Sequence, residues 1–454
     1  MSKTFGLLHS ALLLLIVAGI WILIVHPWMA IGLLVMVPIV KVPAVNYVPF
    51  FGAVDLTVFA NLLAASAAFL AYARRPSKTM APQIPYPMLA SLGVVVFVSL
   101  LGLLWTTAPQ YGQQKLIRFV GIGLPYLLLP SFFVYTKGDA VRLLFLVIAI
   151  SVVIALGLIA LPNSHLAGVR YGFYYDRGTF LGSDPNTPAT LIVAGLLVLL
   201  TGVLTGSTPN ILKYTVFLIF PIGLGGILIS GSRANLLGLC TFLPFAPFIV
   251  GRQGRGKLKF VSLVATSIIF LTAFLVPIMN QEIPVERWLD FSEQIKQGDL
   301  SNTRSQAWAF CLTNAWDHLI LLGHGPGSYA MDFLHKDQPL WPHSILLEAL
   351  YEEGLIGIMA VLYFFIVCLR TTLRGLHACQ SREDVFLVVG VSALVWSMTV
   401  PALTHWDFNG SRFLYLFAGL LHSTVYLVTS NIDEVEAVSG AVVTRAELTK
   451  PDSA

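Results

Sequence analysis

Charged side chains are scarce in this sequence. Asp, Glu, Lys and Arg make up only 11% of the 454 residues, whereas 56% of the residues are hydrophobic. A soluble domain carries roughly 25% charged residues, so this composition has too few polar groups to cover a globular surface. We therefore expect lipid to be the solvent around most of the chain.

Closely spaced cysteine pairs are missing as well, and we expect no cleavable leader. The four cysteines include no Cys-x-x-Cys pair, so neither a disulfide framework nor a zinc site is indicated. The apolar stretch at 11–25 runs on into further apolar sequence and does not end at a small-residue cleavage site. We interpret it as a retained membrane segment.

Long apolar runs are abundant. About 20 residues of helix cross a bilayer. Eleven runs of roughly that length follow the first fifty residues, at 56–73, 88–105, 116–135, 140–161, 187–205, 214–229, 235–250, 260–279, 344–369, 385–400 and 413–428. The first fifty residues, in which Pro27, Pro38 and Pro43 interrupt the apolar pattern, are expected to hold one more tilted crossing. The pattern predicts an all-α polytopic membrane protein with about twelve transmembrane helices.

Basic residues mark one side of the membrane. They gather at 74–78, 137–142, 213, 252–259 and 370–382, and all five groups fall on the same side when the predicted spans alternate. Short cytoplasmic loops are enriched in Lys and Arg. We therefore expect these loops to be cytoplasmic. The polar tail at 430–454 is expected to be cytoplasmic and disordered.

The opposite, exoplasmic side carries the longest polar stretch, at 280–343. A loop of this length is typical of a functional lid, and the mixed polarity of 303–318 predicts a helix within it. The middles of the predicted spans are nearly free of charge. Ion-coupled transporters place ionisable residues there, so this pattern argues against transport.

Two exoplasmic stretches combine arginine with tight turns. In 177–186, Arg177 either binds an anion or reaches lipid phosphate, and Asn186 is expected to cap the next helix. Residues 230–234 read Ser-Gly-Ser-Arg-Ala between two apolar spans. Arg233 suits phosphate because a guanidinium forms paired, charge-assisted hydrogen bonds. The alternatives for Arg233 are an internal ion pair or contact with lipid headgroups.

A third stretch lies within the lid. Arg304 and Trp308 share a helix face at i, i+4. The sequence Gly-His-Gly-Pro-Gly-Ser-Tyr follows at 323–329 and predicts a turn with positive φ angles. His324 is therefore expected to be a turn residue and not a catalyst.

The fourth and fifth stretches provide candidate acid–base groups. His343 lies where the lid enters a span, so its imidazole is partly desolvated and suited to proton transfer, although a structural role is the alternative. Glu348 lies about 140° around that helix from His343 and is not expected to pair with it. Asp407, in a short loop with Arg412, either orients a histidine or neutralises Arg412, and we favour the second interpretation.

These five stretches, in this order and on this face, resemble the O-antigen ligase and O-antigen polymerase family of bacterial membrane glycosyltransferases. The matching elements are the turn at 178–186, the Ser-Gly-Ser-Arg corner at 230–233, Arg304 followed by Trp308, the turn at 323–329, and His343 leading into 346–357. This chain has Ser344 where the family usually has asparagine after the histidine.

The resemblance implies a transmembrane glycosyltransferase domain over 1–429, including the lid at 280–343, in the bacterial inner membrane with its active site facing the periplasm. The donor would be an undecaprenyl-diphosphate-linked glycan. The acceptor would be a hydroxyl of lipid A-core or of another glycan. Membrane lipid surrounds such an enzyme, and no nucleic acid is expected among its partners.

Site roles follow from the resemblance and from side-chain chemistry together. The expected residues are the general base His343, the diphosphate-binding Arg177, Arg233 and Arg304, and the supporting Trp308, Glu348, Asp407 and Arg412. The sequence contains no Asp-x-Asp pair for a divalent metal. We therefore expect a metal-independent transfer without a cofactor, in which arginines carry the charge of the leaving group.

Several functions stay open at this point. The leading hypothesis is a ligase that acts on lipid A-core, and the alternatives within the family are a polymerase or an enzyme that glycosylates a protein hydroxyl. A lipid flippase or permease belongs to a different class and needs a polar path open to each face in turn. The one-sided polar cluster argues against that class. A scaffold would not need arginines in tight interspan corners.

Overall fold

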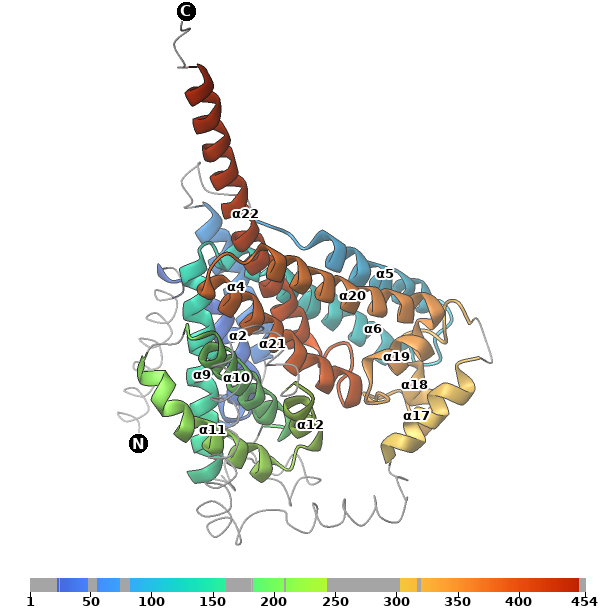
Figure 1. The fold of residues 1–454 in the computed structure, drawn as a ribbon. Helices are drawn as coiled ribbons and strands as arrows, with labels where there is room; N and C mark the ends of the chain where they lie inside the picture. The colour runs from blue at the N-terminus through green and yellow to red at the C-terminus, as the bar shows by residue number, and fades with distance from the viewer. Residues whose placement is uncertain are drawn as a thin grey trace, which may run out of the picture.

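The computed structural model describes residues 25–47, 55–73, 82–160, 183–207, 210–242, 303–316 and 320–448, together with residues 23 and 181. Every regular element in this part of the chain is a helix (Figure 1). The helices are α2 (Met29–Tyr47), α4 (Leu56–Ala73), α5 (Tyr86–Gly102), α6 (Pro109–Arg118), η1 (Phe119–Gly123), α7 (Leu124–Leu128), α8 (Pro130–Phe133), α9 (Lys137–Ala160), α10 (Asn186–Thr205), α11 (Asn210–Ser230), α12 (Arg233–Phe242), α17 (Thr303–Asn314), α18 (Ser328–Leu334), α19 (Ile345–Glu352), α20 (Gly354–Ala378), α21 (Arg382–Thr404) and α22 (Arg412–Leu448). The all-α prediction is confirmed.

Six helices in the described ranges are long and apolar enough to cross a membrane. They are Pro109–Phe133, Lys137–Ala160, Asn186–Thr205, Gly354–Ala378, Arg382–Thr404 and Arg412–Ser430. Four shorter apolar helices fall within α2, α4, α5 and α11. The first 22 residues, the end of the expected span 235–250 and the whole of 260–279 lie outside the described residues. The count of twelve crossings therefore stays a prediction.

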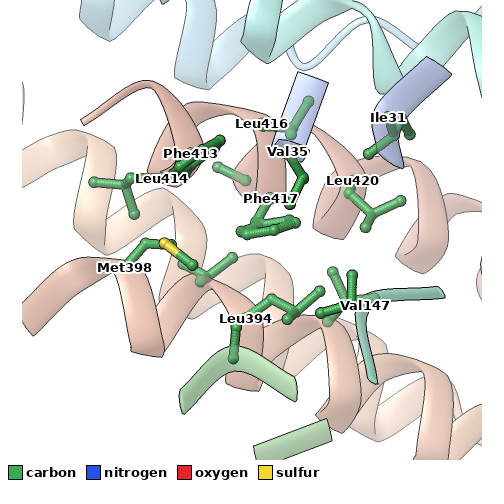
Figure 2. Close-up of a cluster of buried hydrophobic side chains, with 14 of the residues drawn as sticks. Ile31, Val35, Val147, Leu394, Met398, Phe413, Leu414, Leu416, Phe417 and Leu420 are labelled. Atoms are coloured by element: carbon green, nitrogen blue, oxygen red, sulfur yellow. The ribbon is translucent and has the colours of Figure 1, made fainter. Parts of the chain in front are cut away.

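Helices α10 and α22 form the centre of the bundle. The α10 side chains are buried from Pro188 to Thr205. On α22, Phe413 and Phe417 belong to a buried apolar cluster that also takes in α2, α9 and α21 (Figure 2). Dispersion contacts in such a core are individually small and collectively large.

The outer surface of the bundle is apolar. On α20, large hydrophobic side chains are exposed at spacings of three or four residues, namely Met359, Leu362, Ile366, Leu369 and Leu373. This spacing draws one stripe along a helix. An apolar stripe of that length faces lipid in a membrane protein, as the composition predicts.

The described part of the predicted lid is folded. Helices α17 and α18 lie with α19 at one end of α20 (Figure 1). An aromatic cluster joins them, in which the Phe310 ring centroid lies 5.2 Å from that of Phe333 and 5.7 Å from that of Tyr351. The helix predicted at 303–318 is present as α17.

Two helix boundaries differ from the sequence prediction. Helix α6 begins at Pro109, seven residues before the expected span at 116, because the carboxylate of Asp337 accepts hydrogen bonds from the amides of Gln110 (3.1 Å) and Tyr111 (2.9 Å). Helix α22 continues past Ser430 to Leu448, over the stretch for which the sequence predicts a disordered tail.

The topology is testable with two exposed positions at opposite ends of α20, Lys336 and Glu383. The 25 residues of α20 span about 37 Å, more than the hydrocarbon core. In a variant whose four cysteines are changed to serine, we expect Lys336→Cys to react with an impermeant thiol reagent added outside the cell membrane and Glu383→Cys to react only after permeabilisation. The reverse pattern would contradict the exoplasmic assignment of the lid.

Candidate active site

His343 occupies a sharp corner just before α19. Its φ is +58°, a left-handed conformation that costs energy for a residue with a Cβ atom, and the following Ser344 returns to extended backbone. The imidazole Nδ1 lies 3.4 Å from the backbone carbonyl oxygen of His405, which belongs to the loop between α21 and α22. The corner thus brings the fourth and fifth sequence stretches together.

Two tryptophans hold this corner in place. The Trp308 indole on α17 donates to the carbonyl of Pro342 at 2.9 Å. The Trp341 indole donates to the His405 carbonyl at 3.2 Å, and its ring meets the His343 ring edge to face at 5.7 Å. The Trp341 ring therefore packs against the imidazole, and Trp308 fixes the backbone just before His343.

The chemistry of His343 follows from its neighbours. Burial lowers the pKa of the imidazole and the positive charge of Arg304 lowers it further, while the hydrogen bond to the His405 carbonyl and the charge of Asp407 raise it. The net direction is downward, so the ring is neutral at pH 7. A carbonyl oxygen only accepts, so Nδ1 carries the hydrogen in this contact and Nε2 carries the lone pair. A neutral imidazole in this tautomer is a competent base at Nε2.

Arg304 reaches the histidine corner from the lid. It lies one turn before Trp308 on α17, and its charge acts on His343. A second cluster of buried residues, which includes Ala307, Cys311 and Tyr329, packs α17 against α18 and α19. The predicted shared face of Arg304 and Trp308 therefore meets the 342–343 corner.

A separate hydrogen-bond network joins the first two stretches. The Asn186 side chain accepts from Ser232 at 2.9 Å, and the Asn235 side chain donates to the Asn186 carbonyl at 3.1 Å and to the Ser232 hydroxyl at 2.8 Å. Arg233, the first residue of α12, is flanked by these contacts. Arg177 lies outside the described residues.

The expected cap by Asn186 is wrong. Asn186 is already the first residue of α10, and its backbone amide donates to the Asp184 carboxylate at 3.3 Å. The Asn186 side chain turns to Ser232 because the two stretches meet in space. Sequence spacing alone does not reveal that contact.

The favoured pairing of Asp407 with Arg412 is also wrong. The Asp407 carboxylate accepts from the amide of Gly410 at 2.6 Å and closes the loop on itself. The described ion pairs do not include one between Asp407 and Arg412, whose guanidinium lies 5.7 Å from the Phe413 ring centroid. Asp407 acts instead on His343 through its charge.

The glycine turn is confirmed. Gly323, Gly325 and Gly327 have φ of +70°, +90° and +80°. A Cβ atom on Gly323 would lie 2.5 Å from the amide nitrogen of Gly354, so only glycine fits there. The His324 ring stacks on Tyr351 with centroids 4.3 Å apart, in agreement with its expected role as a turn residue.

A buried charge cluster that the sequence analysis missed lies beneath the histidine corner. The ammonium of Lys115 on α6 forms ion pairs with Glu348 and Glu352, and all three side chains are almost completely buried. Glu348 also accepts from the amide of Phe408 at 2.9 Å, which confirms that it is not the partner of His343. Lys115 lies near the beginning of the helix Pro109–Phe133, whose middle carries no charge, as the sequence predicts.

A signal for this cluster was present in the sequence. Lys115 stands at the edge of an apolar run, and Glu348 and Glu352 share a helix face at i, i+4. An ionisable residue in a membrane segment needs a partner. Nothing in the local sequence links 115 to 348, and so the pairing depends on the fold.

These observations define a class: a polytopic helical membrane protein with a half-buried histidine whose pKa is lowered by burial and by the charge of an arginine. A family model described as O-antigen ligase matches residues 215–362. The resemblance to that family is thus confirmed for a segment that contains Arg233, Arg304, His343 and Glu348. The match supports a glycosyltransferase-like enzyme of the O-antigen ligase or polymerase type. No curated protein matches the chain.

The buried lysine gives a stability prediction. Lys115→Met leaves Glu348 and Glu352 without their counter-charge, and such a loss costs roughly 3–5 kcal/mol of unfolding free energy. The control is Lys41→Met, because Lys41 and Asp55 pair at 2.7 Å with side chains 39% and 41% exposed. That change should cost at most about 1 kcal/mol. Thermal unfolding in detergent measures both, and equal effects would contradict the assignment.

Proposed function

We propose that the protein transfers a glycan from undecaprenyl diphosphate to an acceptor hydroxyl at the periplasmic face of the bacterial inner membrane. The preferred acceptor is lipid A-core. The proposal depends chiefly on one observation: the charge of Arg304 acts on His343, whose Nδ1 lies 3.4 Å from the backbone carbonyl oxygen of His405. This arrangement supports a base and an anion-binding group side by side.

The reaction follows from these roles. His343 Nε2 takes the proton of the acceptor hydroxyl while its oxygen attacks the anomeric carbon of the donor sugar. The new glycosidic bond forms, and the bond from that carbon to the diphosphate oxygen breaks. The electron pair leaves with undecaprenyl diphosphate, and the proton stays on the imidazole. A general base of this kind increases the rate of the chemical step by about 10²–10⁴-fold.

The arginines stabilise the negative charge that develops on the diphosphate leaving group. Arg304 and Arg233 supply planar guanidinium groups suited to two phosphate oxygens at once, and Arg177 adds a third in the proposal. Arg412 and Trp308 act in support. Arginines carry this charge without a metal ion or cofactor in the proposed reaction.

An assay with purified protein and a lipid-diphosphate-linked glycan tests the function. A new bond to lipid A-core supports the ligase, whereas a lengthened donor would indicate a polymerase. A glycosylated protein would indicate the third acceptor class. Movement of the lipid across vesicles without a new bond would overturn the proposal in favour of a flippase.

Arg233→Lys tests the phosphate fork. An ammonium cannot form the paired hydrogen bonds of a guanidinium. We expect a loss of about 10–100-fold in transfer rate, from the loss of one bond of roughly 1.5–3 kcal/mol. Arg374→Lys is the control, because Arg374 is exposed near the far end of α20 and should tolerate the change. Near-normal turnover of Arg233→Lys would favour contact with lipid headgroups.

His343→Ala tests the base. We expect this variant to fold and bind donor but to lose at least ~100-fold in transfer rate. His324→Ala should cost much less, because its ring stacks on Tyr351 and serves the turn. Retained activity in His343→Ala together with loss in Asp407→Ala or His405→Ala would move the base to the loop between α21 and α22.

The pH dependence has a defined sign. The neutral imidazole is the active form, and burial and Arg304 hold the pKa of His343 below its ordinary value. The wild-type rate should therefore stay level from pH 8 down through about 6.5 and fall only at lower pH. A fall that begins above the ordinary imidazole value would contradict the environment described for His343.

A further inference from the structure

The orientation of the proposed base depends on one backbone carbonyl. The His405 carbonyl oxygen accepts hydrogen bonds from His343 Nδ1 at 3.4 Å and from the Trp341 indole at 3.2 Å. Any shift of the loop 405–411 would move this acceptor. The tautomer of His343 is therefore coupled to the position of that loop.

Glu348 holds the loop from inside the helical bundle. Its Oε2 accepts from the amide of Phe408 at 2.9 Å, three residues beyond the His405 carbonyl. The neighbouring Asn409 side chain donates to the carbonyl of Lys115 at 3.3 Å. Two successive loop residues are thus tied to the Lys115–Glu348 pair, one through the carboxylate and one through the α6 backbone.

The ion pair with Lys115 allows the buried carboxylate of Glu348 to act as the hydrogen-bond acceptor for the loop. Glu348 is 0% exposed, and burial of an ionised carboxylate is costly unless a counter-charge is present. Lys115, 3% exposed, supplies that charge. A carboxylate accepts an amide hydrogen bond more strongly than a neutral group does.

We propose that Lys115 and Glu348 are positioning residues for His343, an inference that rests on the proposed function. Neither residue touches substrate. Together they fix the loop 405–411 so that its His405 carbonyl keeps the hydrogen on Nδ1 and the lone pair on Nε2. The buried charge pair is thereby part of the apparatus that selects the reactive tautomer.

Glu352 offers a matched control within the same cluster. It is also 0% exposed and also pairs with Lys115. Its carboxylate, however, accepts from the amide of Gly327 at 2.8 Å and so holds the glycine turn. Glu348→Gln and Glu352→Gln remove the same kind of group from the same lysine, and only the first loosens the loop that carries His405.

The pH profile of transfer distinguishes positioning from general stability. The charged groups that act on His343 are Arg304 from α17 and Asp407 from the loop, and the backbone carbonyl of His405 adds a hydrogen bond. The His405 contact raises the pKa of the imidazole, so weakening it lowers that pKa further. Glu348→Gln should move the acid limb of the rate downward by roughly half a pH unit to one unit.

The experiment measures transfer rate from about pH 5 to pH 8, with donor KM, for wild type, Glu348→Gln and Glu352→Gln. We expect Glu348→Gln to lose about 3–10-fold in kcat with donor KM unchanged and the acid limb displaced. Glu352→Gln should keep the wild-type acid limb. Identical acid limbs in the two variants would overturn the inference.

A milder variant guards against loss of the fold. Asn409→Ala removes only the second tether of the loop, from a half-buried side chain. It should displace the acid limb in the same direction by a smaller amount, and an undisplaced limb would count against the inference. Full activity in His343→Ala would instead show that His343 is not the base. Failure of the proposed function and failure of the positioning role are therefore distinguishable.

Discussion

The ammonium of one lysine lies between two carboxylates among apolar helices, and two other parts of the structure attach to this cluster of charges. Lys115 comes from α6, whereas Glu348 and Glu352 come from α19, more than 200 residues later. In a low-dielectric interior each partner is costly without the others. The glycine turn and the loop 405–411 both attach to this cluster, one through Glu352 and the other through Glu348.

The histidine corner takes its properties from two separate segments of the chain. Trp308 and Arg304 approach on the lid helix α17, and the His405 carbonyl approaches on the loop before α22. Three physical effects act there: desolvation, the positive charge of Arg304 and the fixed carbonyl acceptor of His405. Together they favour a neutral ring with its lone pair on Nε2. Helix α17 of the lid packs through its own aromatic cluster onto α18 and α19. The position of the lid and the environment of the proposed base are therefore linked.

Local sequence was a good guide wherever local physics decided the outcome. The apolar runs predicted membrane helices, and the glycines at 323, 325 and 327 predicted positive φ angles. Glu348 does not pair with His343, but the predicted angle between them assumed a single helix, and His343 lies before α19. Sequence was a poor guide wherever a polar side chain had several partners within reach. Asp407 was matched to its neighbour Arg412 but bonds to Gly410, and Asn186 was expected to cap a helix but bonds to Ser232.

The sequence by itself determined the solvent, the helical class and the residue types available for chemistry, because composition and periodicity are sums over local terms. It also carried the ordered motifs that resemble the O-antigen ligase family, and the match over residues 215–362 confirms that resemblance for this segment. Only the tertiary structure decided which charges meet. Lys115 could not be paired with Glu348 from the sequence, and the His405 carbonyl could not be chosen as the acceptor for His343. Both contacts join residues at least 60 positions apart, and their energy arises only when packing excludes water around them.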